Sequence, residues 1–400
     1  MPAGAYRRWV WLRTDGGGFR SIPVNLTVWD FALPALATLK TQFGSPAARI
    51  REPHRGGASA DAMYAQAARM LTEHQFNAAI PPTLLAHKVK ADGSFDLTDD
   101  QIAGLKAFAA AWHVNAVPIP RPSSRFGDPV KDRARIAAWL RSWDRNLDRA
   151  GLGDRLCYTY LIDEPNDAKA YEHTRAWGKA VRESGSRVKV LVTEQTRTQN
   201  AAWGTLDGAI DIWVPLFSLF RAGSAAKRQA AGEAIWTYTA LCQGKQPTPW
   251  WHTDYPLVNY RAPAWIAWRH GMTGLLYWGG MAYWKQATDP WTDPWTYGKT
   301  RVGARYEPRG RVYNGEGTLL YPGRDCGLVG AVPSVRLKAL RDAIEDYEYL
   351  AILDRLGKRK EALAVVDSVA RSWTDWSTDP AAITKARERL AQLIVLSGTR

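Results

Sequence analysis

Residues 132–165, DRARIAAWLRSWDRNLDRAGLGDRLCYTYLIDEP, hold the pattern that decides the fold. The first part predicts a helix over residues 132–150, and the apolar run at 157–162 predicts a short buried strand. Pro165 then stops further strand pairing, because proline has no backbone N–H to donate. A helix followed by a buried strand and a polar loop is the repeating unit of a parallel sheet.

The same alternation extends in both directions along the chain. Besides 132–150, helices are expected at 61–74, 101–111, 167–183, 225–240 and 262–270. The eight expected barrel strands are 75–80, 114–119, 157–162, 188–192, 210–217, 248–252, 275–278 and 318–321. An earlier strand at 39–43 could instead be the first, which would shift the count by one. Eight units over about 250 residues predict an α/β fold of the (β/α)8 TIM-barrel type, with an open doubly wound sheet as the alternative.

Both ends of the chain differ from this pattern. A strand at 22–31 predicts a remnant N-terminal β segment, and three helices at 334–356, 360–372 and 381–396 predict a C-terminal helical extension. Ser334 is the expected N-cap of the first of these helices. Its expected apolar face is Leu337, Leu340, Ile344, Tyr347 and Leu350, and its charged residues Arg341, Asp342, Glu345, Asp346 and Glu348 are expected mainly on the other face. The expected division is 1–36, 37–333 and 334–400.

Composition bounds the classes of function. The 400 residues include 20 tryptophans and three widely spaced cysteines, and the net charge is +14. No stretch has the length and apolarity of a membrane span, and no signal-peptide pattern opens the sequence. We therefore expect a soluble cytoplasmic protein, or a secreted one if the sequence is a piece of a longer chain. The basic residues are scattered and no nucleic-acid motif occurs, so an anionic glycan is the acidic partner that we consider. The oligomeric state is left open.

The adjacent carboxylates Asp163 and Glu164 are the strongest indication of catalytic chemistry in the sequence. They follow the buried strand directly, and catalytic groups of a barrel lie at the carboxyl ends of its strands. Neighbouring side chains of a strand point to opposite faces, so both can reach one site only where the chain leaves the pleat. Two adjacent carboxylates suit a general acid beside an ionised partner. The alternative is an acidic pair that stabilises the helix beginning near Asp167.

Aromatic and polar residues at the other strand ends suggest a sugar cleft, because sugar C–H faces pack on aromatic rings and sugar hydroxyls bind polar groups. The candidate substrate-binding residues are Glu194, Trp213, Trp251, His252, Asp254, Tyr255, Tyr277 and Trp278. Any one of these aromatic residues could instead belong to the core. No HExxH, histidine pair at ligand spacing or GxSxG motif occurs, so we expect no metal, no cofactor and no serine-hydrolase chemistry.

Four segments resemble the catalytic domain of glycoside hydrolase family 123 and its relatives in domain of unknown function family 4091. They are YLIDEP at 160–165, YWG at 277–279, GTLLYPG at 317–323 and PSVRLKALRDAIEDYEYL at 333–350. The segment VWDFALP at 28–34 also resembles the exit from the β-sandwich that precedes the barrel in that family. The resemblance implies a retaining β-N-acetylgalactosaminidase that uses substrate-assisted catalysis. Glu164 would then be the general acid/base, and Asp163 would hold the 2-acetamido group as it attacks the anomeric carbon.

Two other functions are left open by the sequence. A conventional retaining glycosidase would keep Glu164 as acid/base and take its nucleophile from another strand, Glu194 or Asp254, about 5–5.5 Å away. A carbohydrate-binding barrel without catalysis is the alternative from another class. The intact Asp163–Glu164 pair argues against it.

Overall fold

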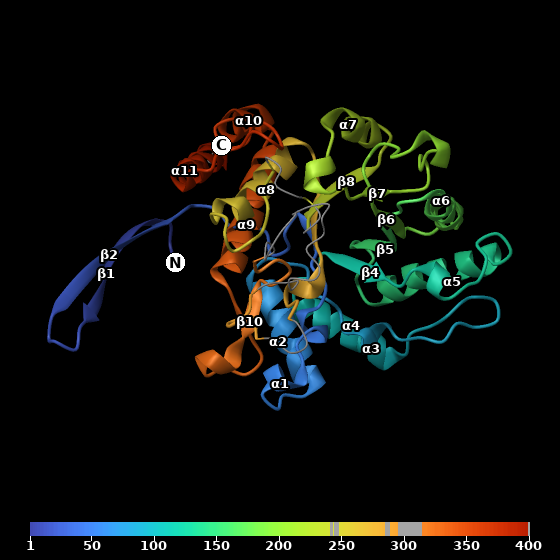
Figure 1. Cartoon of the computed structure of the whole chain (residues 1–400), viewed down its shortest axis with the longest axis horizontal. Coiled ribbons are helices and arrows are strands. Elements are labelled where there is room, and N and C mark those ends of the chain that lie inside the picture. The colour runs from blue at the N-terminus through green and yellow to red at the C-terminus, as the bar shows by residue number, and fades with distance from the viewer. Residues whose placement is uncertain (241–242, 244–247, 285–288, 295–313, 399–400) are drawn as a thin grey trace.

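A computed structural model describes residues 1–240, 243, 248–284, 289–294 and 314–398. Seven parallel strands form one nearly closed sheet in the order β3-β9-β8-β7-β6-β5-β4, with helices around it (Figure 1). The strands are β3 (Lys40–Gln42), β4 (Ala116–Ile119), β5 (Leu156–Asp163), β6 (Lys189–Thr193), β7 (Ile212–Trp213), β8 (Ala234–Thr239) and β9 (Gly274–Tyr277). The predicted (β/α)8 barrel class is confirmed.

Residues 76–80 fill the gap between β3 and β4. Their backbone forms no regular ladder, but the N–H of Asn77 donates to Oγ1 of Thr41 at 2.8 Å and the N–H of Ala78 donates to the carbonyl of His113 at 2.6 Å. The side-chain oxygen of Asn77 also accepts from the backbone N–H of Asn115 at 2.9 Å. An amide side chain thus replaces strand pairing here. The first barrel strand is β3, so the alternative count that began at 39–43 is the right one.

The predicted helix at 225–240 is wrong in its second half. Helix α7 (Ala222–Ala230) ends before Gly232, which has a φ of 80°, and the next residues form β8. Ile235, Trp236 and the residues after them are β-branched or aromatic, a composition that favours a strand. This strand takes the barrel position that had been assigned to 248–252, and residues 248–252 form no strand.

The predicted strand at 318–321 is not a barrel strand either. It corresponds to β10 (Leu320–Pro322), which pairs antiparallel with β11 (Ala331–Pro333) in a separate two-stranded sheet. At the N-terminus, β1 (Gly4–Arg13) and β2 (Phe19–Val28) form an exposed antiparallel hairpin that projects from the body of the molecule (Figure 1). The strand predicted at 22–31 therefore begins and ends three residues earlier.

The outer helices have local signals for their ends. The side chains of Ser59 and Asp167 cap α2 and α6, and Thr98 forms a capping box with Gln101 at α4. The helices of the barrel are α1 (Glu52–Arg55), α2 (Ala60–Glu73), α3 (Pro82–Leu85), α4 (Asp99–Ala111), α5 (Arg133–Arg149), α6 (Ala168–Arg182), α7 and α8 (Val258–Arg269). Among the described residues, no helix is long and apolar enough to cross a membrane.

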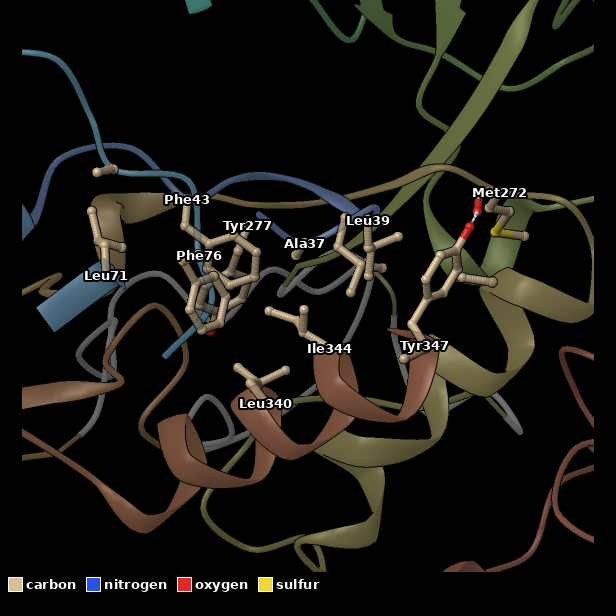
Figure 2. Packing of buried hydrophobic residues seen from close by; sticks show 14 of the residues in the cluster. Ala37, Leu39, Phe43, Leu71, Phe76, Met272, Tyr277, Leu340, Ile344 and Tyr347 are labelled. Atoms are coloured by element: carbon tan, nitrogen blue, oxygen red, sulfur yellow. Dashed lines mark hydrogen bonds between the residues drawn. The ribbon is translucent and has the colours of Figure 1, made fainter. Parts of the chain in front are cut away.

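Helix α9 (Val335–Arg355) covers the place where β3 meets β9. Ser334 caps it, and its five predicted apolar residues are all buried. Figure 2 shows Leu340 and Ile344 pointing toward the core, and the hydroxyl of Tyr347 donates to the carbonyl of Met272 at 2.9 Å. Helices α10 (Arg359–Val366) and α11 (Pro380–Gly398) pack beside it.

Two acidic residues of α9 are buried, contrary to the expectation that they lie on its outer face. Asp346 accepts hydrogen bonds from the guanidinium of Arg261 at 2.7 and 2.9 Å. Glu348 accepts from the backbone and hydroxyl of Thr38 at 2.6 and 2.7 Å, just before β3, and burial raises the pKa of Glu348. These bonds satisfy carboxylates that would otherwise be costly to bury, and they attach α9 to α8 and to the start of β3.

Candidate active site

The end of β5 bends so that two adjacent carboxylates reach one pocket. The pairing of β5 with β6 shifts register between Tyr160 and Ile162, and Glu164 has a φ of 44°. The left-handed conformation costs a residue other than glycine about 1–2 kcal/mol, and such strain tends to occur at functional sites. The bend removes the alternation that would point Asp163 and Glu164 to opposite faces, and both line the same pocket.

Asp163 is held by two hydroxyl groups. The hydroxyls of Tyr160 and Thr193 donate to its Oδ1 at 2.6 and 2.7 Å. Within the described part of the chain, no hydrogen bond is made to its other oxygen, Oδ2. Burial, chiefly, raises the pKa of Tyr160, so this phenol stays a donor across the working pH range. Asp163 is therefore oriented as an acceptor with one oxygen available to a ligand.

Glu164 is fixed from both sides. Its backbone N–H donates to Oγ1 of Thr193 at 2.8 Å, and the hydroxyl of Tyr238, on β8, donates to its Oε1. Thr193 therefore contacts both members of the pair, from the end of the neighbouring strand β6. Hydroxyl groups of Tyr160, Thr193 and Tyr238 thus donate to the two carboxylates.

The pocket above this pair has the size and lining of a sugar site. Its volume is about 570 Å³, within the range of small-molecule sites. The aromatic residues of its described lining are Phe43, Tyr160, Tyr238, Tyr277 and Trp278. Aromatic walls beside two carboxylates suit a ring that has apolar C–H faces and polar hydroxyls.

The two aromatic residues at the end of β9, Tyr277 and Trp278, are held by the segment 315–317. The indole N–H of Trp278 donates to Oε1 of Glu316 at 2.7 Å, and the backbone N–H of Gly317 donates to the hydroxyl of Tyr277 at 2.6 Å. Glu316 is completely buried, and its Oε2 lies 2.9 Å from Nε2 of His252. His252 is thus one contact behind the aromatic wall and does not line the pocket.

Glu194, predicted as a substrate-binding residue, lies beside the pocket and not on its lining. It is 4% exposed, and its carboxylate accepts from the side chain of Gln199 at 2.7 Å and from the backbone N–H of Gln195 at 2.8 Å. Burial, opposed by these bonds and reinforced by Glu164, raises the pKa of Glu194 to about 7. Gln199 also donates to the carbonyl of Pro165, so Glu194 supports the loop that carries the pair.

The remaining predicted residues lie apart from Asp163 and Glu164. Trp213 is buried and donates to Glu233 at 2.7 Å, and Trp251 is buried and donates to the carbonyl of Asn259 at 3.0 Å. Asp254 is exposed and accepts from the side chain of Asn314, and the ring of Tyr255 lies 5.9 Å from that of His252. Of the ten predicted site residues, Asp163, Glu164, Tyr277 and Trp278 share the pocket.

The sequence did not identify Tyr160, Thr193, Tyr238 or Arg49 as site residues. Tyr160 lies close to the predicted acidic pair, and Thr193 lies next to the predicted Glu194. Their positions at strand ends could therefore have indicated them as site residues. Tyr238 was hidden by the wrong helix at 225–240. Arg49 follows β3, which was considered only as an alternative first strand. Within the described residues, no group of three or more His, Cys, Asp or Glu side chains could hold a metal ion.

Carboxylates in an aromatic pocket at the carboxyl end of a barrel define the general class of the glycoside hydrolases. The description "Glycoside hydrolase 123, catalytic domain" matches residues 132–353, more than half of the chain and including the acidic pair, β8, β9 and most of α9. The chain belongs to this family of glycoside hydrolases, as the resemblance predicted. No curated protein matches the sequence.

Solved structures resemble the chain only distantly. The β-glucuronidase of Ruminococcus gnavus is 10% identical, with a TM-score of 0.36 over 85% of this chain and 57% of that chain. A glycosyl hydrolase family 2 member from Bacteroides cellulosilyticus is 10% identical, with a TM-score of 0.31 over 68% of this chain and 34% of that chain. The chain thus spans little more than half the length of the β-glucuronidase.

Proposed function

We propose that the protein cleaves β-linked N-acetylhexosaminides, with N-acetylgalactosaminides favoured, and that it retains the anomeric configuration by substrate-assisted catalysis. The observation that carries the proposal is the fixed position of Asp163, oriented by Tyr160 and Thr193, directly beside Glu164. A mechanism without an enzyme nucleophile needs a carboxylate next to the acid, since that carboxylate must hold the acetamido group of the substrate. We assign the activity to residues 37–333, with 334–400 as a supporting helical part and 1–36 as a separate β segment.

In the first step, Glu164 gives its proton to the glycosidic oxygen as the bond from that oxygen to the anomeric carbon breaks. The acetamido carbonyl oxygen attacks the anomeric carbon from the opposite face and forms an oxazolinium ring. Asp163 accepts a hydrogen bond from the acetamido N–H and stabilises the positive charge that develops there. In the second step, the Glu164 carboxylate takes a proton from water, and the water oxygen attacks the anomeric carbon and reopens the ring.

The competing mechanism uses an enzyme nucleophile. Its two candidates, Glu194 and Asp254, are hydrogen-bonded elsewhere and do not line the pocket. Their positions therefore favour the substrate-assisted route. A protein that only binds carbohydrate would not need the strained, left-handed backbone of Glu164. This conformation therefore favours catalysis over binding alone.

A substrate screen combined with variants tests the proposal. The screen compares aryl β-N-acetylgalactosaminides, aryl β-N-acetylglucosaminides and unmodified aryl β-hexosides. We expect turnover of the acetamido sugars, inhibition by a thiazoline mimic of the ring intermediate, and a loss of about 10²- to 10³-fold in kcat/KM for Asp163→Asn. Azide rescue of Glu194→Ala or Asp254→Ala would assign an enzyme nucleophile and overturn the mechanism. Binding of glycans without release of sugar at any pH would overturn the enzyme assignment.

A further inference from the structure

Among the described residues that line the active-site pocket, Arg49 is the cation. It follows the short helix η1 (Pro46–Ala48) after β3, and it lines the pocket together with Ser45, Asp163 and Glu164. Its side chain is exposed and has neither an ion pair nor a hydrogen bond within the described structure. A guanidinium in a ligand pocket without a carboxylate partner from the protein is available to the ligand.

Within the described structure, neither pocket carboxylate forms an ion pair with Arg49. Oδ1 of Asp163 is engaged by Tyr160 and Thr193, and Oε1 of Glu164 by Tyr238. Arginine residues elsewhere on the surface of the barrel do form ion pairs, for example Arg149 with Asp99 at 2.7 Å. The described lining of the pocket therefore holds, besides its two acids, an arginine that forms no ion pair with them.

Local backbone geometry makes room for the Arg49 stem. Gly280, two residues after Trp278, has a φ of 63°, and a Cβ added there would lie 3.1 Å from Cγ of Arg49 and 3.2 Å from the carbonyl oxygen of Ser45. A Cβ on Gly44, whose φ is 69°, would in turn lie 3.6 Å from Cα of Gly280. The loops after β3 and β9 thus approach closely through two glycines, and this contact places the Arg49 stem against the base of the Trp278 wall.

We propose that Arg49 binds an anionic group on the substrate, so that the enzyme prefers glycans that carry a sulfate ester or a carboxylate on the sugar unit in the pocket or on the unit linked to it. The planar fork of arginine matches the oxygens of both groups, and hydrogen bonds between charged partners are the strong ones. The net charge of +14 would assist by attracting anionic substrates at low salt. This inference rests on the proposed function for its substrates but concerns a different residue and a different part of the ligand.

The test compares matched neutral and anionic substrates. Aryl β-N-acetylgalactosaminide is measured beside its 4-sulfate and 6-sulfate, and a disaccharide of N-acetylgalactosamine linked to a hexose beside one linked to a hexuronate. We expect kcat/KM to be at least tenfold higher for one anionic form, with an advantage that shrinks as salt rises. Whether a sulfate or the uronate gives the advantage identifies the source of the charge.

Three variants locate the preference. Arg49→Gln is expected to lower the ratio of anionic to neutral kcat/KM at least tenfold, and Arg49→Lys to lower it less, because it keeps the charge but loses the fork. Arg51→Gln is the matched control, since Arg51 is also exposed, two residues away, but does not line the pocket, and it should leave the ratio unchanged. An equal rate on neutral and anionic substrates in the unaltered protein, or a preference that persists in Arg49→Gln, would overturn the proposal.

A binding measurement separates this inference from the proposed reaction. Glu164→Gln protein is titrated with N-acetylgalactosamine and its 4- and 6-sulfates in a calorimeter, and the titrations are repeated with Arg49→Gln added. Tighter binding of a sulfated sugar that depends on Arg49 supports the anion site, even if the unaltered protein cleaves none of the glycosides. In that case the proposed function alone would fail. Equal affinity for sulfated and unsulfated sugar, together with equal affinity for the hexose-linked and hexuronate-linked disaccharides in the same titrations, would reject the anion site and leave the proposed function standing.

Discussion

The hydroxyl of Tyr238 donates a hydrogen bond to Oε1 of Glu164 across the mouth of the barrel. The two residues come from β8 and β5, which are separated in the sheet by β7 and β6. The bond therefore does not follow from strand pairing, and it spans the opening in which a substrate would sit. It orients the carboxyl group that we propose as the general acid/base.

Removal of this bond should slow the reaction and leave the fold intact. Hydrogen bonds to charged groups contribute about 1.5–3 kcal/mol, so Tyr238→Phe is expected to lower kcat/KM by about 10- to 100-fold. Tyr64→Phe is a matched control, since Tyr64 lies on α2, away from the pocket, and packs against the core. Steady-state kinetics with circular dichroism on both variants checks the prediction. Equal activity of the two would show that the Tyr238 bond does not matter for catalysis.

Glu194 should make stability fall as pH rises. Burial raises its pKa to about 7 from a usual value of 4.5, so the folded protein keeps a proton that the unfolded chain releases between these values. The native state then binds more protons than the unfolded state, and the free energy of unfolding decreases with pH through this window. For a pKa of about 7 against a usual 4.5, the full effect is on the order of 3 kcal/mol.

Urea unfolding of the unaltered protein and of Glu194→Gln at pH 4.5, 6 and 7.5 isolates this contribution, because titrating groups that do not interact with Glu194 cancel in the difference. As pH rises, the free energy of unfolding of the unaltered protein should fall relative to that of Glu194→Gln. This relative fall should level off above pH 7. A difference that is constant, or that moves the other way, would contradict the buried, proton-retaining carboxyl group.

The ion pair between Asp346 and Arg261 should be a major support of the barrel. Asp346 is completely buried, and it also accepts from the indole N–H of Trp265 at 2.9 Å. Loss of one partner from a buried pair costs about 3–5 kcal/mol, so Asp346→Ala is expected to lower the free energy of unfolding by that amount. Asp342→Ala, one turn earlier on α9 and half-buried beside Arg341, should cost less than about 1 kcal/mol. If urea unfolding showed similar losses of unfolding free energy for the two variants, the buried pair of Asp346 would not be a major support of the barrel.

The barrel class and the acidic pair could be predicted from the sequence because both depend on local order. A short apolar run that leads directly into Asp163-Glu164-Pro165 indicates both a buried strand and a pair of carboxylates at its carboxyl end. Strand β8 could not be placed as easily, because the alanine-rich stretch before it continues the pattern of α7 and Gly232 is the main break. Residues 76–80 are held partly by the side chain of Asn77, and no pattern of apolar residues encodes that contact.

The aromatic residues could not be sorted in the same way. Trp213, Trp251 and Trp278 all lie within or at the end of predicted strands, yet Trp278 alone of the three lines the pocket. The difference arises from partners far along the chain, such as Glu233 for Trp213 and Glu316 for Trp278. Arg49 and Tyr238 likewise reach the pocket only because the sheet closes. Apart from Asp163 and Glu164, most residues of the site are therefore brought together by the closure of the barrel, which local sequence patterns do not reveal.

The most direct test of the central claim is the dependence of Glu164→Gln on the leaving group. If Glu164 protonates the departing oxygen, its loss should matter most for a leaving group that needs the proton. We expect kcat/KM to fall at least 100-fold more for an alkyl or sugar leaving group than for an activated nitrophenol. A loss of the same size for every leaving group would contradict the assignment of Glu164 as the general acid.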